Sequence, residues 1–511
     1  MTGAVSTAPT RLGRVTEQMR VRPAEPPRWT LDQVAAEVGS TASGDAEVTG
    51  VALNTAHVVP GDLYAALPGA SAHGASFVDA AAAAGAVAVL TDVAGAESVS
   101  GRLPTVVVED PRAVLAGLSA AFYDHPASAF TTIGITGTQG KTTTTYLAEA
   151  ALAEHRSAVV GTIGTRIRRV PAASSLTTPE APALQALFAV MREEAVEALA
   201  MEVSSHALVK GRVDGFAFDV AVFLNLGRDH LDFHETLEDY FLAKASLFTP
   251  EHARHAVLNV DDRHALRIAE MTSLPVTTFS AGGAAADWRA ANVRPHRLGT
   301  DLEVLGPDGS ATDLHVPLAG VFNVSNALAA VAALATAGHD PVELAAGIAA
   351  STGVPGRMER VDAGQDFTAV VDYAHKPEAV SAVLGALRPV TAGRLIVVLG
   401  AGGDRDQGKR PLMGRAAADL ADVVVITDDN PRTENPAAIR AEVLAGAEGG
   451  SAVVHEIGGR REAIQHAVAL ARRADTVVVA GKGHERGQEI AGVVHPFDDR
   501  EVLVELIEAA R

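Results

Sequence analysis

The residues that most clearly could do chemistry form a short glycine-rich segment, Thr136–Thr143, with the sequence TGTQGKTT. An apolar run precedes the segment and an alanine- and threonine-rich run follows it, so we expect it to connect a strand to a helix. Glycines let backbone N–H groups approach phosphate oxygens, while Lys141 would supply a positive charge and Thr142 a ligand for Mg²⁺. The loop is shorter than the standard Walker motif, which has a glycine where Ile135 stands. The pattern predicts an ATP site at Gly137, Thr138, Gln139, Gly140, Lys141, Thr142 and Thr143.

Two metal-ligating side chains follow apolar runs farther along the chain. Glu202 lies at the end of the run Ala198–Val203, and His230 comes soon after the run Val220–Asn225. A carboxylate and an imidazole that converge on the phosphates would suit a second divalent cation. Each residue on its own is more often a hydrogen-bonded structural group, so the residue types alone leave both readings open.

Lys244 lies on a predicted helix in the segment Asp239–Phe248. Its position alone indicates a solvated lysine, or one whose aliphatic stem is buried while its amine reaches water.

A third set of polar loops follows apolar runs in the last third of the chain. These loops contain Gly402–Asp406, Asp429–Arg432 and Gly481–Glu485. Arginines such as Arg405 and Arg432 bind carboxylates through two hydrogen bonds, and carboxylates such as Asp429 and Glu485 accept from an ammonium group. The combination predicts a pocket for the zwitterionic end of an amino acid, with a structural salt-bridge network as the alternative.

The elements that must position these residues are those of an α/β protein with parallel sheets. Short β-branched runs alternate with alanine-rich helical runs, and the runs are apolar almost throughout, as expected for strands covered on both faces. Ligands bind at the carboxyl ends of such strands, where the polar loops lie. We expect a disordered tail over residues 1–28 and α/β domains over residues 29–125, 126–355 and 356–511.

Composition restricts the class of protein and its partners. The chain has 511 residues, enough for about three domains. Its net charge of −20 disfavours nucleic acid, and no apolar run approaches the length of a membrane-spanning helix. The chain has no cysteine, which removes disulfides and cysteine nucleophiles and fits a reducing compartment. We therefore expect a cytoplasmic enzyme that does not insert into membranes.

The shortened glycine loop resembles that of the Mur ligase and folylpolyglutamate synthetase superfamily. The other motifs make the chain most similar to the MurE type of the Mur ligase family, and the resemblance covers nearly everything after residue 30. It implies three α/β domains: a small N-terminal UDP-binding domain, a central phosphate-loop domain with a parallel sheet, and a C-terminal Rossmann-like domain that binds the amino acid.

The resemblance also implies roles for individual residues. Glu202 and His230 would hold the second Mg²⁺, and Lys244 would carry a carbamate derived from CO₂, which converts a cation into an anionic metal partner. ATP would contact Asn326, Arg357, Asp372 and His375 in addition to the loop, although Asn326 could instead only cap a helix. The UDP-muramoyl-dipeptide would contact Leu53, Thr55, Thr177, Thr178, Ser204 and Arg212. The family usually has Asp-Ser-Arg where this chain has Asn54, Thr55 and Ala56, so the resemblance is weakest for the residues that would contact uridine.

The activity that the resemblance implies is amide formation driven by ATP. ATP phosphorylates the D-glutamyl γ-carboxylate of UDP-N-acetylmuramoyl-L-Ala-D-Glu, and the amine of diaminopimelate attacks the acyl phosphate. The sequence Asp-Asn-Pro-Arg resembles the form found in diaminopimelate-adding members. Diaminopimelate would then contact Arg405, Asp429, Asn430, Pro431, Arg432, Gly481 and Glu485. A monomer is expected.

Two rival functions share part of this pattern. A folylpolyglutamate synthetase would have the same loop and ligase chemistry, but it would not carry Asp-Asn-Pro-Arg in its last domain. A non-catalytic nucleotide switch would keep Gly137–Thr142 and have no use for Glu202, His230 and Lys244 together.

Overall fold

The computed structural model describes residues 18–99, 101–153, 155–173, 176–230 and 233–510. These residues separate into two compact units. Unit 1 runs to Phe130 and also includes Arg156–Leu199 and Lys210–Phe216, whereas unit 2 consists of Thr131–His155, Ala200–Val209 and Ala217–Arg511. Within the described ranges, no helix is both long enough and apolar enough to cross a bilayer.

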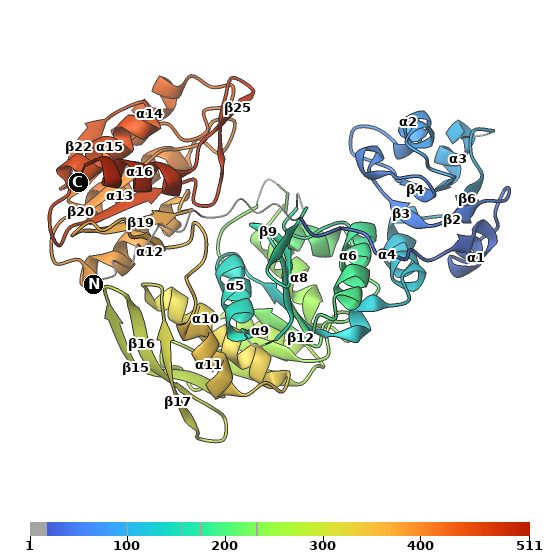
Figure 1. Ribbon diagram of the computed structural model, residues 1–511, viewed down its shortest axis with the longest axis horizontal. Coiled ribbons are helices and arrows are strands. Elements are labelled where there is room, and N and C mark those ends of the chain that lie inside the picture. Colours follow the sequence, from blue (N-terminus) through green and yellow to red (C-terminus); the bar gives the residue numbers. More distant parts are fainter. Residues whose placement is uncertain (1–17, 100, 154, 174–175, 231–232, 511) are drawn as a thin grey trace, which may run out of the picture. The chain divides into compact units, whose positions relative to one another are not determined.

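Unit 1 is built on a four-stranded parallel sheet in which β4 and β5 are buried along their whole length (Figure 1). Its strands in spatial order are β3 (Gly50–Ala52), β4 (Asp62–Ala66), β5 (Ala88–Thr91) and β6 (Thr105–Val107). The helices are α1 (Leu31–Glu37), η1 (Thr55–His57), η2 (Gly74–Phe77), α2 (Val78–Ala83), α3 (Val93–Val99), α4 (Pro111–Phe122) and η3 (Pro126–Ala129). A separate antiparallel pair joins β1 (Trp29–Thr30) to β2 (Glu47–Val48).

The remaining part of unit 1 contains β8 (Ser157–Gly161), β9 (Gly164–Ile167) and β10 (Val170–Ala172), which are antiparallel, and α6 (Ala181–Glu193). Residues 18–28 contradict the expected disordered tail, because the backbone N–H of Met19 donates to Pro171 O at 2.8 Å and Arg22 binds the buried Asp62 through two 2.8 Å hydrogen bonds. Residues 1–17 of that predicted tail lie outside the described residues.

The first sheet of unit 2 carries the glycine loop. Its strands in spatial order are β11 (Ala198–Glu202), β7 (Thr131–Thr136), β12 (Val220–Phe223), β13 (Ala256–Asn259), β14 (Val276–Ser280), β15 (Trp288–His296), β16 (Gly299–Leu305) and β17 (Ala311–Val316). The strands from β7 to β15 pair in parallel. Because β7 and β12 are parallel neighbours, the segments after these two strands reach one edge of the sheet together, and the N–H of Val203, directly after β11, donates to Ile135 O near the end of β7 at 2.8 Å.

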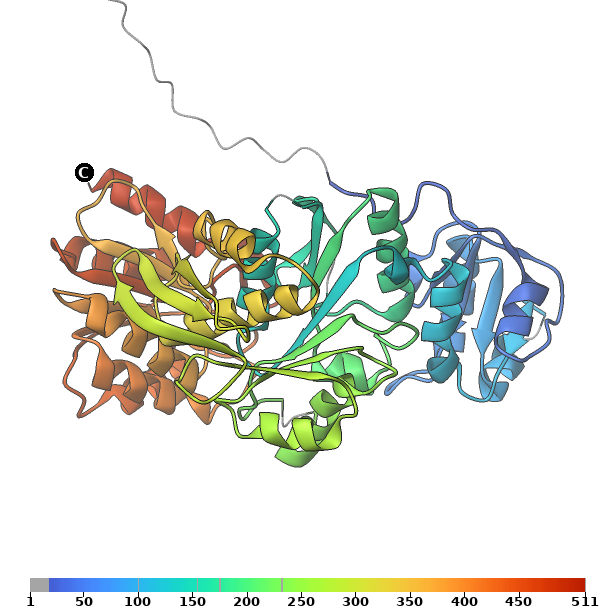
Figure 2. The same cartoon turned by 90° about the horizontal axis from the view of Figure 1, so that it is seen from below.

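The helices of this part of unit 2 are α5 (Lys141–Ala151), α7 (Ser205–Val209), α8 (Leu237–Ala245), η4 (Ser246–Phe248), α9 (His264–Met271), α10 (Val321–Thr336) and α11 (Pro341–Ala349). Helix α10 packs on α5, and α11 packs on β17. Figures 1 and 2 show α10 and α11, in yellow, beside the long antiparallel strands β15–β17. These antiparallel strands were not expected from the sequence.

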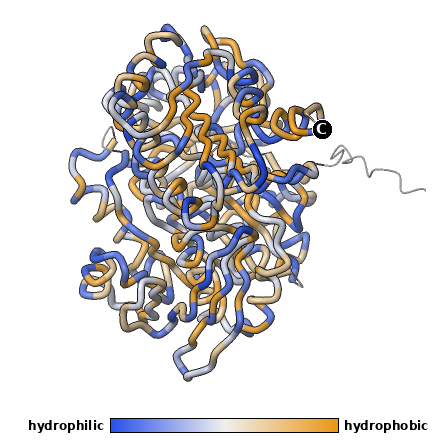
Figure 3. The backbone as a smooth tube through the Cα atoms, turned by 90° about the vertical axis from the view of Figure 1, so that its left-hand side faces the viewer, coloured by the Kyte–Doolittle hydropathy of each residue, from blue (hydrophilic) through white to orange (hydrophobic). Residues whose placement is uncertain are grey.

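The second sheet of unit 2 has a core of fully buried strands. In spatial order it comprises β18 (Glu359–Val361), β19 (Thr368–Asp372), β23 (Thr476–Ala480), β20 (Leu395–Leu399), β21 (Val423–Ile426) and β22 (Val453–Glu456), and only β18 is antiparallel. Its helices are α12 (Pro377–Leu387), η5 (Arg388–Val390), α13 (Lys409–Leu420), α14 (Pro436–Ala447), α15 (Arg460–Leu470) and α16 (Asp499–Ala509), and a hairpin joins β24 (Gly487–Ile490) to β25 (Val493–Pro496). Runs of valine, isoleucine and leucine fill this core and form hydrophobic stretches of the chain in Figure 3.

Candidate active site

The glycine loop between β7 and α5 is held by one asparagine. The side chain of Asn225, which follows β12, accepts from the N–H of Gln139 at 2.9 Å and donates to its carbonyl at 3.1 Å. The backbone carbonyl of Asn225 also accepts from the N–H of Thr138 at 3.0 Å. Gly140 has φ +88°, and a Cβ at this position would collide with the amide oxygen of Asn326. The loop is therefore fixed before any phosphate binds.

Two lysines donate to the same carbonyl of this loop. The Nζ atom of Lys141 lies 2.8 Å from Gly137 O, and that of Lys244 lies 2.9 Å from the same oxygen. Burial lowers the pKa of Lys141, against the attraction of Glu202 and Asp229. Burial also lowers the pKa of Lys244 well below its ordinary value, and the neighbouring charge of Lys141 lowers it further. Lys244 is thus no solvated lysine, because its side chain is buried and its amine has an increased neutral fraction.

An aromatic ring lies beside the second lysine. Lys244 Nζ lies 4.5 Å from the centre of the Tyr240 ring, and the Tyr240 hydroxyl lies 3.2 Å from the hydroxyl of Thr138. Helix α8 carries both Tyr240 and Lys244, and a capping box between Thr236 and Asp239 fixes its start. The helix end therefore contacts the phosphate loop through two successive turns.

The two predicted metal ligands follow the strands on either side of β7. Glu202 is buried at the end of β11, and its charge acts on Lys141. His230 has φ +52°, a strained conformation for a residue with a side chain. Burial lowers the pKa of His230, so its ring is neutral and has a lone pair for a metal. A carboxylate, a neutral imidazole and the Thr142 hydroxyl are suitable donors for a divalent cation beside phosphates.

The loop that carries His230 is tied down by a charged partner. Asp229 lies 2.5 Å from Nζ of Lys376 and 3.4 Å from Nε2 of His230. Two further histidines lie nearby: the ring of His206 is 4.9 Å from that of His230, and His234 Nε2 lies 2.9 Å from the Ser205 hydroxyl.

Asn326 shares the loop side of α10, where it donates to Asn323 Oδ1 at 3.2 Å.

Residues predicted to meet ATP in the last part of the chain form an aromatic and cationic group. The Arg357 guanidinium stacks on Tyr373 at 4.4 Å, with His484 on the same ring at 5.1 Å. Asp372 accepts from the N–H groups of Met358 and Ala374 at 2.7 and 2.8 Å. Burial raises the pKa of Asp372 and lowers the pKa of His375 to about 4. Buried Nε of Arg357 has no hydrogen-bond partner among the described residues, so it is open to a ligand.

The predicted amino-acid pocket contains a lysine that the sequence reasoning did not assign. Lys482 is fully buried and donates to Asn430 Oδ1 at 3.0 Å and to Glu485 Oε2 at 3.1 Å. Glu485 also accepts from Asn430 Nδ2 at 2.9 Å, so this carboxylate is already engaged. Asp429 is buried and its Oδ2 has no hydrogen-bond partner within the described ranges. Asp429 is therefore the more available acceptor for an ammonium group.

The two arginines predicted for the amino acid differ in their surroundings. Arg432 has φ +54°, donates to Gly403 O at 2.6 Å and lies 3.3 Å from Glu489. Pro431 precedes it in a turn that reaches the β24 hairpin, since the N–H of Arg432 donates to Glu489 O at 3.0 Å. Arg405 is exposed and donates to Asp404 O at 3.2 Å. The structure holds Arg432 in place and leaves Arg405 at the surface.

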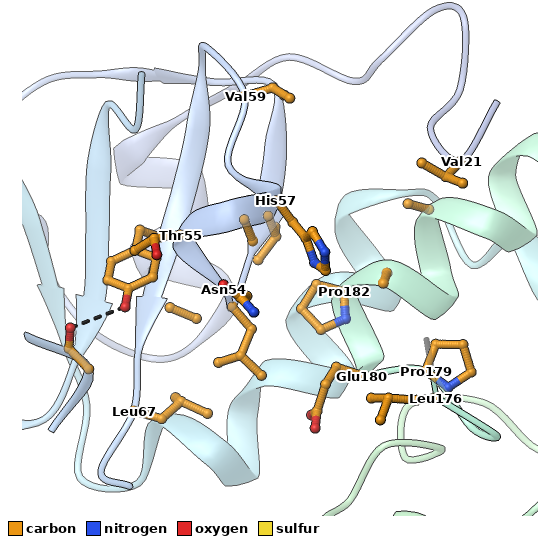
Figure 4. A pocket seen from close by; sticks show the side chains of 18 of the residues that line it. Val21, Asn54, Thr55, His57, Val59, Leu67, Leu176, Pro179, Glu180 and Pro182 are labelled. Atoms are coloured by element: carbon orange, nitrogen blue, oxygen red, sulfur yellow. Dashed lines mark hydrogen bonds between the residues drawn. The ribbon is translucent and has the colours of Figure 1, made fainter. Parts of the chain in front are cut away.

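Unit 1 contains a separate cavity of about 1230 Å³. Figure 4 shows Asn54, Thr55 and His57 on one side and Pro179, Glu180 and Pro182 on the other. Glu180 precedes α6 and binds Arg112 and Arg212 at 2.7 Å each. Leu53 also lines the cavity.

The other predicted UDP-substrate residues lie near this carboxylate or in unit 2. Arg212 donates to Thr178 O at 3.1 Å, and the Thr177 hydroxyl lies 3.1 Å from that of Thr162. Ser204, in unit 2, precedes α7 and accepts from the N–H of Ala207 at 3.2 Å.

Comparison with known proteins places this geometry in a family. Models described as the Mur ligase catalytic domain, the Mur ligase middle domain and the Mur ligase glutamate ligase domain match residues 47–123, 135–334 and 356–483. A UDP-N-acetylmuramoyl-L-alanyl-D-glutamate–2,6-diaminopimelate ligase from Streptomyces avermitilis is 55% identical over 95% of this chain and 98% of its own length. The chain belongs to the Mur ligase family.

Other relatives agree with this assignment and with the expected three-domain α/β fold. The Corynebacterium glutamicum ligase of the same name is 49% identical over 91% of this chain and 92% of its own length. A solved structure of a ligase of that name is 36% identical, with a TM-score of 0.64, and the match covers 91% of this chain and 95% of that one. A Mycobacterium tuberculosis folylpolyglutamate synthase complexed with ADP and AMPPCP shares the fold at 21% identity and a TM-score of 0.59, over 72% of this chain and 92% of that one.

A second group of metal-ligating residue types lies on β15–β17. His315 Nδ1 lies 2.8 Å from Asp301 Oδ1, and His296 Nε2 lies 3.4 Å from the same oxygen. The N–H of Leu298 donates to His296 Nδ1 at 3.2 Å, so the neutral ring carries its proton on Nε2. As it stands, the group connects three strands through one shared carboxylate.

Proposed function

We propose that this Mur ligase joins 2,6-diaminopimelate to the D-glutamyl γ-carboxylate of UDP-N-acetylmuramoyl-L-Ala-D-Glu, at the expense of ATP. The γ-phosphoryl group passes to the carboxylate, the amine attacks the resulting acyl phosphate, and phosphate leaves from the tetrahedral intermediate. The observation that carries the proposal is the preformed loop 137–142, which lies between the segments after β11 and β12 and holds two lysines, the half-buried Lys141 and the buried Lys244, on Gly137 O. The 55% identical relative supports the choice of substrates.

Within this reaction, Lys141 would leave Gly137 O to meet the outer phosphates, while the N–H groups of the loop bind the phosphate oxygens. Thr142, Glu202, His230 and a modified Lys244 would hold Mg²⁺. Bound Mg²⁺ would neutralise charge on the transferring phosphoryl group. Arg357, with its open Nε, is suited to the same charge.

Lys244 is proposed to act as a carbamate. Two ammonium groups on one carbonyl repel a cation, so the unmodified pair does not suit a metal site. CO₂ reacts with the neutral amine, and burial together with Lys141 increases the neutral fraction of Lys244. The product is an anion beside Glu202 and His230, which are suitable metal ligands.

The two ends of the substrates have separate candidate subsites. The cavity of unit 1, with Leu53 and Thr55, is proposed to bind the UDP end, and Thr177, Thr178, Ser204 and Arg212 the muramoyl dipeptide. Arg405, Asp429, Asn430, Arg432, Gly481 and Glu485 are proposed to bind the zwitterionic end of diaminopimelate. A monomer acting in the cytoplasm is part of the same proposal.

The test measures phosphate release from ATP in the presence of the UDP-muramoyl-dipeptide. Separate reactions contain meso-diaminopimelate, LL-diaminopimelate, lysine or no amino acid. The proposal predicts release that depends on one form of diaminopimelate and a product heavier by that residue. A parallel reaction with a folate and glutamate should give none. Turnover with lysine alone, or with folate, would refute the assignment of substrates.

A further inference from the structure

The open oxygen of Asp429 depends on a buried charge network behind it. Asp429 Oδ1 accepts from the N–H of Asn430 at 2.8 Å, whereas the buried Oδ2 has no hydrogen bond among the described residues. An unpaired carboxylate oxygen in a buried position is costly, which indicates that a cationic ligand completes it. A Cβ on Gly481 would lie 2.6 Å from this oxygen, so the glycine leaves it room.

Arg460 connects the strand ends on which these residues lie. It is the first residue of α15 and its side chain is fully buried. Its Nη2 donates to Ala480 O at 3.0 Å, directly before Gly481, and its Nη1 lies 3.4 Å from Asp428 O, directly before Asp429. One guanidinium therefore sets the spacing between the ends of β21 and β23.

Asp499 fixes the orientation of the Arg460 guanidinium. This fully buried first residue of α16 accepts from Arg460 Nε at 2.7 Å and from Nη2 at 2.6 Å. Arg460 Nη1 lies 3.9 Å from Asp429 Oδ2, too far for a hydrogen bond. Asp499 thus holds the guanidinium close to Asp429 without letting it occupy the open oxygen.

We infer that Arg460, held by Asp499, is a positioning residue that keeps Asp429 and Gly481 ready for the ammonium group of the incoming amino acid. The inference rests on the proposed function, since it names what orients the amino-acid subsite. Loss of the guanidinium would free the two strand ends. Loss of the Asp499 charge would instead let Arg460 turn to Asp429 and block the same oxygen. Both changes weaken amino-acid binding, by opposite routes.

The experiment measures kcat and three KM values for Arg460→Lys and for the isosteric Asp499→Asn. Each variant should raise the KM for diaminopimelate by about tenfold or more and leave the KM values for ATP and the UDP-substrate within about twofold. The matched control is Arg394→Lys, because Arg394 forms a similar pair with Asp475 and bonds Leu470 O at the opposite ends of β20 and β23. That variant should lower the unfolding temperature with all three KM values unchanged.

The outcomes separate the inference from the function on which it rests. Wild-type protein that releases no phosphate with any diaminopimelate isomer refutes the proposed function. Wild-type activity together with an unchanged KM for diaminopimelate in both variants overturns the inference. A fall in kcat in both variants with every KM unchanged also overturns the inference, because a smaller fraction of folded protein would give that result. If Arg460→Lys does not fold, Asp499→Asn alone decides.

Discussion

Gly137 O accepts from the half-buried Lys141 and the buried Lys244, and the proposed chemistry requires that this arrangement change when ATP binds. Lys141 is the first residue of α5 and can turn toward phosphates from there, whereas Lys244 is held beside Tyr240. The two lysines therefore have different expected roles although they share one acceptor. Under the proposal, Lys141 would keep its charge for the phosphates, whereas Lys244 would become an anionic carbamate.

Lys244→Ala tests the second role. We expect a loss of at least about a hundredfold in kcat, because an anionic metal partner is removed, and added bicarbonate should not restore it. Wild-type protein in ¹³CO₂ should give a carbamate carbon signal that the variant lacks. Lys210→Ala, at an exposed position, is the control and should keep both signal and activity. Full activity of Lys244→Ala would remove the proposed role.

Arg432→Ala tests whether Arg432 binds the carboxylate at the zwitterionic end of diaminopimelate. The KM for diaminopimelate should rise by about tenfold to a hundredfold, with kcat affected less, because a charge-assisted pair is lost. Arg415→Ala, which removes an exposed arginine from α13, is the comparison and should leave this KM unchanged. Equal KM values in the two variants would refute the assignment of Arg432.

At the scale of elements, the phosphate loop is held by the segment that follows a neighbouring strand. Asn225→Ala removes both side-chain hydrogen bonds to Gln139 and should raise the KM for ATP by about tenfold. The KM for diaminopimelate should stay within about twofold, which steady-state kinetics would show. A KM for ATP equal to that of the wild type would mean that the loop keeps its shape without this clamp.

The sequence predicted the elements that consist of buried parallel strands, and the ligating residues that it indicates follow such strands directly. The run Ala198–Val203 contains β11, and the run Val220–Asn225 contains β12. The antiparallel β15–β17 were missed because their residues are polar and half exposed, a pattern that also fits loops. Arg460 was missed because an arginine at the start of a helix resembles a surface residue, and its burial depends on distant Asp499.

At the scale of the whole molecule, the structure holds two half-buried histidines in neutral form. Burial lowers the pKa of His375 to about 4, and burial together with Arg357 lowers the pKa of His484 to about 4, against an ordinary value of 6.5. As pH falls, the unfolded chain therefore binds protons at a higher pH than the folded chain does. The free energy of unfolding falls as pH drops below 6.5. Each histidine should cost about 2 kcal/mol at pH 5 relative to pH 7.5.

Urea unfolding at pH 7.5 and pH 5 measures this effect. In His484→Asn, the difference in free energy of unfolding between the two pH values should shrink by about 2 kcal/mol. His495→Asn, which removes an exposed histidine of β25, should leave the difference unchanged. An equal pH dependence in wild type and His484→Asn would show that His484 titrates normally in the folded protein.

The central claim is that the loop 137–142 holds ATP while its terminal phosphoryl group passes to a carboxylate. Isotope transfer tests it most directly, with both γ-carboxylate oxygens of the D-glutamyl substrate labelled with ¹⁸O. One labelled oxygen should appear in each phosphate released during diaminopimelate-dependent turnover, because the acyl phosphate keeps a substrate oxygen when the amine attacks. Phosphate without the label would show that water, and not the carboxylate, receives the phosphoryl group.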